Sequence, residues 1–229
     1  MLLCTTPFAA AAGDTPYYDW KQYDPRWASV VLTNKTMKQV GCLATSVAML
    51  AVHSGLRGRE GFDPGVFAAE MRKAGGFNED DDLVWEAIPK AVPGLTVLNP
   101  WERLEGTQAE KTARLKGYLD KGYQVAVAVK HGGHWVALCS VEGGKAVMMN
   151  PGGESGDLFA KYPAKGVNRV ALLCADKPEE KPKETQLPAA KPSMTKEEYI
   201  AIAESVFEFL KDMGSLLLAI AQYVYTLGK

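Results

Sequence analysis

The sequence predicts a protein of the α+β class, with helices early in the main domain and an antiparallel sheet after them. Two observations support this class. Segments bounded by helix-start and helix-stop residues fill the chain between residues 42 and 122. Short runs of β-branched or alternating apolar residues follow, and Gly143 and Gly144 provide a hairpin turn between two of these runs.

Capping residues mark the expected helices. Asp63 is a good N-cap and Pro64 suits the first helical position, while Thr107 and Glu110 form a capping box. The acidic run at 79–82 suits a helix N-terminus, because the helix dipole favours negative charge there. Glycines follow three of these helices at positions 55, 75 and 122. The expected helices are residues 42–54, 63–75, 83–91 and 107–121.

The expected strands are short and apolar, as in a half-buried antiparallel sheet. Their sequences are QVAVAVK, HWVALCSVE, KAVMMN and RVALLCA, at residues 124–130, 134–142, 145–150 and 169–175. The apolar pattern ends there, so the main domain is expected to cover residues 14–176.

The C-terminal part differs in composition from the main domain. Residues 177–193 are rich in Pro, Lys and Glu, which predicts a semi-extended linker. Residues 194–229 carry apolar side chains at helical spacing, which predicts amphipathic helices. Few basic residues flank these helices, so an oligomer contact or a protein partner is favoured over contact with a membrane surface.

Residues 1–13 resemble the end of a secretory signal. Alanines occupy 9–12 and offer an A-x-A cleavage site before the chain turns polar at Gly13 and Asp14. The basic segment that normally comes first is missing and the apolar stretch is short, so we interpret this segment as a truncated signal rather than a disordered arm. This predicts a secreted bacterial protein, or one of the periplasm or cell surface.

Composition excludes several classes of protein. The net charge is -1, from 26 basic and 27 acidic residues, whereas nucleic-acid binding needs a basic excess on one face. No apolar run reaches the roughly 20 residues of a membrane-spanning helix. No Cys and His residues have zinc spacing, and the acidic run at 79–82 is interpreted as a solvated helix cap rather than a calcium loop. We therefore expect no metal and no cofactor.

One cysteine stands where a nucleophile could be activated. Gly41 lets the backbone turn sharply, and Cys42 then begins the first expected helix. The free N–H groups and the dipole at a helix start stabilise a thiolate and lower the pKa of a thiol. Taken alone, this placement fits a small buried core residue equally well. Cys139 and Cys174 lie in apolar strands and are expected to be buried thiols or one disulfide.

A nucleophilic cysteine needs a base, and the chain has 3 histidines. His53 would lie about 16 Å from Cys42 along the helix axis. That is too far, so His53 is interpreted as a cation at the helix C-terminus or a surface residue. His134 opens a strand, whereas His131 precedes two glycines and is expected on a surface loop. Because a strand holds a base more rigidly than a glycine loop does, His134 is the expected base.

A catalytic base also needs a partner that orients its ring, and Asn150 follows the next strand. With a regular two-residue turn at 143–144, Asn150 faces away from His134. A three-residue turn or a bulge brings both onto one face, within hydrogen-bond reach. A triad of Cys42, His134 and Asn150 therefore requires an odd-length loop or a bulge in this hairpin. The alternative is that Asn150 is a turn residue before Pro151.

Together these motifs resemble a known family. The segments QYDPRWASVVL, GCLATSVAML, GGHWVAL and MMNPGG follow the order and spacing of papain-like cysteine peptidases related to the bacteriocin-processing, double-glycine-leader peptidases. The resemblance covers about residues 17–175. It implies a papain-like fold in which Cys42 is the nucleophile, His134 the base and Asn150 the orienting residue. Many members have Asp at the position of Asn150, and an amide stabilises a charged imidazole less than a carboxylate does.

The resemblance also implies an upstream Gln that donates to the oxyanion, with the backbone N–H of Cys42 as the second donor. Gln22, in WKQYDPRW, matches this position better than Gln39, whose side-chain direction is unconstrained. The implied activity is hydrolysis of a peptide or protein substrate through an acyl-enzyme. Two alternatives stay open: a cell-wall peptide hydrolase of the NlpC type, and a papain-like shell that serves as a non-catalytic binding module.

Overall fold

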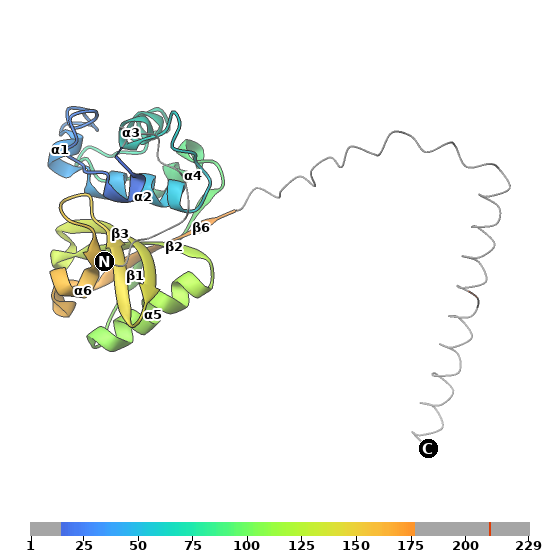
Figure 1. Ribbon diagram of the computed structural model, residues 1–229. Coiled ribbons are helices and arrows are strands. Elements are labelled where there is room, and N and C mark those ends of the chain that lie inside the picture. Colours follow the sequence, from blue (N-terminus) through green and yellow to red (C-terminus); the bar gives the residue numbers. More distant parts are fainter. Residues whose placement is uncertain (1–14, 177–210, 212–229) are drawn as a thin grey trace, which may run out of the picture. The chain divides into compact units, whose positions relative to one another are not determined.

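The computed structural model describes residues 15–176 and Lys211 (Figure 1). Contacts divide the chain into two units, Met1–Glu180 and Lys181–Lys229. The described part of the first unit contains a sheet and its helices, and Lys211 in the second has helical backbone. The segments expected at 1–13, 177–193 and 194–229 lie outside the described residues, apart from Lys211.

The strands of the described residues form one antiparallel sheet in the order β1-β6-β2-β3-β4-β5. The strands are β1 (Leu95–Arg103), β2 (Tyr123–Val129), β3 (His134–Glu142), β4 (Lys145–Met149), β5 (Gly156–Asp157) and β6 (Arg169–Ala175). The strands β2, β3, β4 and β6 lie where the sequence predicts them. An antiparallel sheet with several helices agrees with the predicted α+β class.

The helices are α1 (Met37–Val40), α2 (Cys42–His53), α3 (Pro64–Lys73), α4 (Ile88–Ala91), α5 (Gln108–Asp120) and α6 (Leu158–Lys161). Short 3₁₀ turns are η1 (Tyr17–Asp19), η2 (Trp85–Ala87), η3 (Lys130–Gly132) and η4 (Ala164–Gly166). The helices α2, α3 and α5 agree with the sequence prediction. So do two of their caps: Asp63 accepts the N–H of Val66 at 2.8 Å, and Thr107 and Glu110 form the expected capping box.

Helices cover both faces of the sheet. The helices α1 to α4 lie on one side, and α5 and α6 lie on the other (Figure 1). Successive side chains of β3 point to opposite faces of the sheet and so enter different apolar cores. Trp135 and Ala137 belong to the core on the α2 side, and Val136 and Leu138 belong to the core on the other side. Each helix layer therefore has its own apolar core on the shared sheet.

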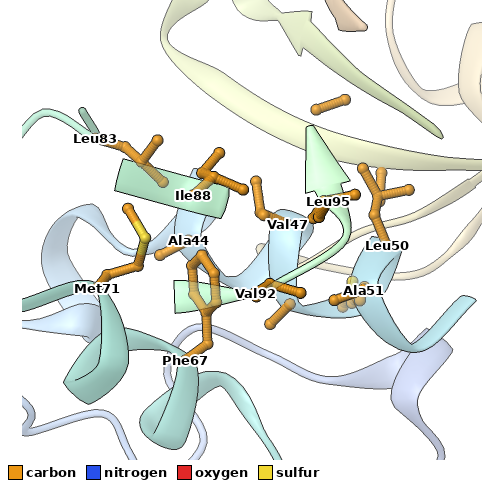
Figure 2. Packing of buried hydrophobic residues seen from close by; sticks show 14 of the residues in the cluster. Ala44, Val47, Leu50, Ala51, Phe67, Met71, Leu83, Ile88, Val92 and Leu95 are labelled. Carbon is orange, nitrogen blue, oxygen red and sulfur yellow. The ribbon is translucent and has the colours of Figure 1, made fainter. Parts of the chain in front are cut away.

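The core between α2 and its neighbours determines where Cys42 lies. Figure 2 shows side chains of α2 interdigitated with those of α3, α4 and the start of β1, namely Ala44, Val47, Leu50, Phe67, Met71, Ile88 and Leu95. Full burial of one Leu- or Phe-sized side chain contributes roughly 1.5–3 kcal/mol. This layer holds α2 against the sheet and places its first residue at one end of β3.

Two strands, β1 and the short β5, are missing from the sequence prediction. Strand β1 precedes α5, so helices and strands are not separated along the chain as cleanly as predicted. Pro100 interrupts its apolar pattern, and the pairing with β6 shifts register on both sides of Asn99. Proline removes a backbone donor and is tolerated in edge strands. Accordingly, β1 lies at the edge of the sheet.

The expected helix at 83–91 is present only over residues 85–91, as the 3₁₀ turn η2 followed by the single turn α4, and its expected acidic cap is wrong. Leu83 instead pairs with Phe77 in an isolated bridge, and only η2 and the single turn α4 follow. Asp81 is 6% exposed, and its Oδ1 accepts the backbone N–H groups of residues 33–35 at 2.8, 2.7 and 3.0 Å. Asp81 therefore stabilises a neighbouring loop and does not cap a solvated helix.

Candidate active site

Cys42 is the first residue of α2, and its sulfur lies next to β3. Burial raises the pKa of the Cys42 thiol, and the backbone of Trp135, of Leu43 and of Cys42 itself lowers it by less. The expected stabilisation of a thiolate at a helix start is therefore present, but burial outweighs it. The contact with Trp135 brings the sulfur to the residue that directly follows His134.

Gly41 has a different role from the expected one. Its φ of -77° is open to any residue, so no sharp glycine turn is needed. A Cβ at this position would lie 2.5 Å from the carbonyl oxygen of Met37 and 2.8 Å from its Cα. Glycine is required because α1 and α2 approach too closely for a side chain.

His134 is the first residue of β3 and is 9% exposed. The turn η3 precedes it, where Lys130 and His131 have φ values of 51° and 58°. A left-handed backbone costs a non-glycine residue roughly 1–2 kcal/mol. Strain of this kind is typical of functional sites. His131 itself is exposed, as the sequence predicts.

The hairpin between β3 and β4 has the register that a Cys–His–Asn triad requires. Its turn is the regular two-residue one, but Cys139 forms a bulge that shifts the register. Beyond the bulge Ala137 pairs with Met149, so Asn150 lies on the same face as His134. The predicted bulge is confirmed.

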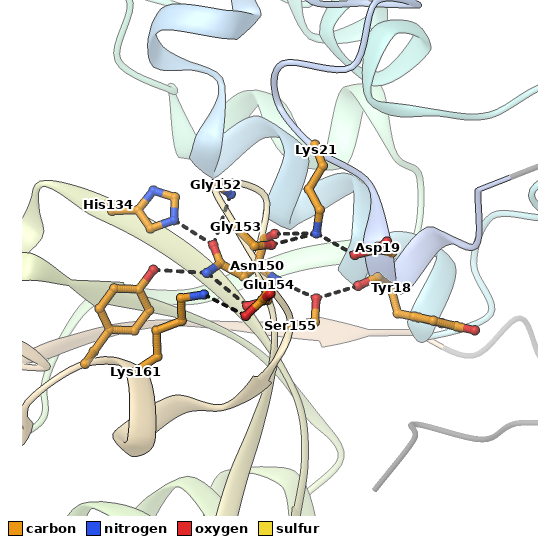
Figure 3. A network of polar contacts seen from close by, with 11 residues as sticks. Tyr18, Asp19, Lys21, His134, Asn150, Gly152, Gly153, Glu154, Ser155 and Lys161 are labelled. Carbon is orange, nitrogen blue, oxygen red and sulfur yellow. Dashed lines mark hydrogen bonds and ion pairs between the residues drawn. The ribbon is translucent and has the colours of Figure 1, made fainter. Parts of the chain in front are cut away.

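His134 and Asn150 share a buried hydrogen bond of 2.9 Å between Nε2 and Oδ1 (Figure 3). The Oδ1 atom also accepts the N–H of Gly152 at 3.0 Å. The Nδ2 atom donates to the carbonyl of Glu154 at 3.3 Å and to the hydroxyl of Tyr162 at 3.0 Å. Because the amide oxygen faces the ring, Nε2 of His134 carries the proton and Nδ1 keeps its lone pair.

The electrostatic surroundings keep His134 neutral near pH 7. Burial lowers the pKa of His134, the hydrogen bond with Asn150 raises it, and the positive charge of Lys130 lowers it further. The net effect is a pKa below the ordinary imidazole value. Since the pKa of Cys42 is raised, Cys42 rests as a neutral thiol and His134 as a neutral imidazole.

Gln22 contacts two segments, the helix α1 that precedes Cys42 and the loop that follows Asn150. Its Nε2 donates to the carbonyl of Lys38 in α1 at 3.0 Å, and its backbone N–H donates to the carbonyl of Pro151 at 3.0 Å. Gln39 is exposed, and its Oε1 accepts two hydrogen bonds from Thr36 as part of the α1 cap. The side chain of Gln39 is thus occupied in a cap, whereas Gln22 contacts both segments.

Two other sequence interpretations change. His53 is the last residue of α2, at the helix C-terminus as expected, but it is not a surface residue and its charged form is disfavoured: it is half-buried, its Nδ1 lies 3.0 Å from the hydroxyl of Tyr17, and burial lowers its pKa. Cys174 carries a free thiol, so the disulfide considered between Cys139 and Cys174 is not formed. Cys42 is also free, as expected.

Three residues near the candidate triad are not predicted by the sequence. Tyr162 bonds to Asn150, and Gly152 lies against the imidazole of His134. The Nζ of Lys21 donates to the carbonyls of Asn150 and Gly153 at 3.1 and 2.7 Å (Figure 3). The glycines after Asn150 were a usable signal, because they suggest a close backbone approach. Neither Lys21 nor Tyr162 has any local signal in the sequence.

Within residues 15–176 no group of three or more His, Cys, Asp or Glu is arranged to hold a metal ion. The same described residues contain no helix with the length and apolarity needed to cross a bilayer. Compared with known proteins, the chain matches no family model, no curated protein and no solved structure. The function is therefore inferred from the geometry of the site.

Proposed function

We propose that the protein is a secreted cysteine peptidase with a papain-like fold, which hydrolyses peptide or amide bonds. Cys42 is the nucleophile, His134 the base and Asn150 the residue that orients the base. The observation that supports this most strongly is the buried hydrogen bond from Nε2 of His134 to Oδ1 of Asn150. This bond leaves Nδ1 of His134 as the proton acceptor. The backbone of Trp135, the next residue of the same strand, contacts the sulfur of Cys42.

The proposed reaction is acyl transfer through a thioester. Nδ1 of His134 takes the thiol proton as the sulfur of Cys42 attacks the substrate carbonyl. The backbone N–H of Cys42 and the second N–H of the Gln22 amide, whose first N–H bonds to the carbonyl of Lys38, donate to the oxyanion. The imidazolium then protonates the leaving amine, and the C–N bond breaks. His134 then deprotonates a water molecule, whose oxygen attacks the thioester carbonyl. The C–S bond breaks, the acid product leaves, and the sulfur of Cys42 takes the proton back from the imidazolium.

The protonation states support a base-assisted attack rather than a permanent ion pair. Burial disfavours both the free thiolate of Cys42 and the free imidazolium of His134. Proton transfer to Nδ1 creates both charges together, and adjacent opposite charges stabilise each other in a buried site. Asn150 holds the ring in the tautomer that accepts this proton.

A non-catalytic binding module is the second candidate. The raised pKa of Cys42 supports it, because an unactivated buried thiol is chemically inert. The two candidates differ in one measurable property, the reactivity of Cys42 at neutral pH.

The test is labelling by iodoacetamide at neutral pH, followed by mass spectrometry of the modified peptides. A Cys174→Ser background removes the other free thiol of the described residues. We expect complete labelling of Cys42, and His134→Ala slows it by about 10²-fold or more. A Cys42 that reacts no faster in this background than Cys174 does in a Cys42→Ser protein, or equally fast without His134, would refute the proposal. Peptide libraries and peptidoglycan fragments then separate a general peptidase from a cell-wall hydrolase.

A further inference from the structure

Three tryptophan rings meet beside the candidate triad. The centroid of the Trp101 ring lies 5.9 Å from that of Trp85 and 6.4 Å from that of Trp135. The centroids of Trp85 and Trp135 are 5.9 Å apart. Trp135 directly follows His134, and its backbone contacts the sulfur of Cys42. The three rings therefore form one aromatic cluster that starts next to the reactive sulfur.

One ring of this aromatic cluster is open to solvent. Trp85 is 5% exposed and Trp135 is 9% exposed, because both belong to the core on the α2 side of the sheet. Trp101 is 55% exposed, more than any other large apolar side chain among the described residues. Aromatic side chains bind most strongly when they are covered. An exposed Trp that contacts two buried ones beside a reactive thiol therefore offers a surface that a ligand can cover.

The exposure of Trp101 results from the local structure of β1. Between the paired residues Asn99 and Glu102, two residues of β1 stand opposite one residue of β6. These two residues are Pro100 and Trp101. The side chain of Asn99 stabilises the bulge, because its Oδ1 accepts the N–H of Trp101 at 3.0 Å and its Nδ2 donates to Glu102 at 2.9 Å. Bulges of this kind redirect a side chain and are frequent next to active sites.

The surroundings of Trp101 suit an aromatic ligand. The Cζ of Arg169 lies 5.1 Å from the centroid of the Trp101 ring, and such a cation is attracted to the face of an indole. The three rings of the aromatic cluster meet at angles between 62° and 81°, so they form angled walls rather than one flat stack. Aromatic rings prefer edge-to-face or offset contacts, so a further ring fits against such walls.

We propose that Trp101 is a specificity-determining residue, which forms with Trp85 and Trp135 a subsite for an aromatic side chain of the substrate. An extended peptide advances about 3.3–3.6 Å per residue, so a side chain within about two or three positions of the bond cleaved by Cys42 reaches the aromatic cluster. The substrate class is a peptide with an aromatic residue near the scissile bond. This assignment to a substrate rests on the proposed function, whereas binding of an aromatic ring at Trp101 does not.

The first test compares alkylation of Cys42 by iodoacetamide and by N-benzyl iodoacetamide in the Cys174→Ser background. Both reagents carry the same reactive group, so the ratio of their rates cancels the intrinsic reactivity of the thiol. The ratio for glutathione gives the value without a subsite. We expect the ratio for Cys42 to exceed that for glutathione by about 2- to 10-fold, to fall to the glutathione value in Trp101→Ala, and to stay raised in Trp101→Phe.

Leu98→Ala is the matched control for this test. Leu98 is an exposed apolar residue of the same strand and lies outside the aromatic cluster, so its removal should leave the ratio unchanged. A ratio that Trp101→Ala does not lower, or that Leu98→Ala lowers equally, would overturn the proposal.

A binding measurement tests the subsite without any reaction. In Cys42→Ser protein labelled with ¹⁵N-tryptophan, loss of one indole signal in Trp101→Phe assigns Trp101. We expect this signal to shift on titration with N-acetylphenylalanine amide and not with N-acetylalanine amide. No shift, equal shifts with both amides, or a shift with N-acetylglucosamine alone would overturn the proposal, the last in favour of a sugar ligand. If Cys42 proves unreactive in every form, the proposed function fails, while this titration still decides whether Trp101 binds an aromatic ring.

Discussion

Gly152 leaves no room for a side chain beside His134. A Cβ at Gly152 would lie 2.7 Å from Cε1 of the imidazole and 2.9 Å from Nε2. Side-chain atoms do not approach so closely, so either the ring or the loop would have to move. The same glycine donates its N–H to Asn150 Oδ1, which holds the loop in this close position.

Gly152→Ala should therefore impair the site more than the fold. In the proposed mechanism the imidazole must align with the thiol of Cys42, and a misplacement of about 1 Å can cost about 10²-fold in rate. We expect the rate of Cys42 alkylation to fall by at least about tenfold, while the unfolding midpoint changes little because residue 152 is exposed. Gly153→Ala is the matched control, since its Cβ would meet Nδ2 of Asn150 at an ordinary 3.5 Å. Equal rates for the two variants would contradict the prediction.

The pH dependence of Cys42 alkylation follows from the two shifted pKa values. Burial lowers the pKa of His134 below the ordinary 6.5, so the base form is present at neutral pH. The rate should rise as pH increases through that lowered pKa and then stay level. Burial raises the pKa of Cys42 above the ordinary 9.0, so in His134→Ala the rate should rise only in the alkaline range.

The measurement is the second-order rate with iodoacetamide across the pH range in both proteins. The advantage of the original protein over His134→Ala should be greatest near neutral pH and shrink as the solution becomes alkaline. One shared profile that rises only at alkaline pH would show that His134 does not assist Cys42.

Features that one short segment of the chain determines can be predicted from the sequence. The capping residues of α3 and α5 stand next to those helices in the sequence. His134 was preferred to His131 as the base because it lies in an apolar strand. Whether His134 and Asn150 lie on the same face of the sheet depends on the register of the hairpin, and the bulge at Cys139 sets that register. These features depend on neighbours in the chain.

The role of a residue cannot be predicted from its own segment where that role depends on partners that are distant in the chain. Asp81 was assigned to a helix cap because its charge suits one, yet its N–H donors come from residues 33–35. Strand β1 was missed because its partner β6 is the last strand of the sheet in the sequence, and Pro100 breaks the local pattern. Tyr162 looks like any core aromatic until its contact with Asn150 is known.

Asp81 should contribute strongly to stability, because one buried carboxylate oxygen satisfies three backbone donors. Burial raises the pKa of Asp81, but the N–H groups of residues 33–35 together lower it by more, so the net shift is downward. Asp81→Ala leaves those three donors without this acceptor, and we expect a clearly lower midpoint of urea unfolding. Asp80→Ala, at an exposed neighbouring position, is the control and should leave the midpoint nearly unchanged. Similar midpoints for both variants would show that the loop finds other acceptors.

His131→Gly should distinguish the two neighbouring histidines and test the strain in η3. The left-handed φ of 58° costs His131 roughly 1–2 kcal/mol, and glycine adopts it freely. Glycine loses more backbone entropy on folding, by roughly 0.5–1 kcal/mol. The net change in unfolding free energy should therefore lie between none and a gain of about 1.5 kcal/mol. Alkylation of Cys42 should be unaffected, because His131 is exposed and Nδ1 of His134 is the expected base. A large loss of reactivity in His131→Gly would instead favour His131 as the base.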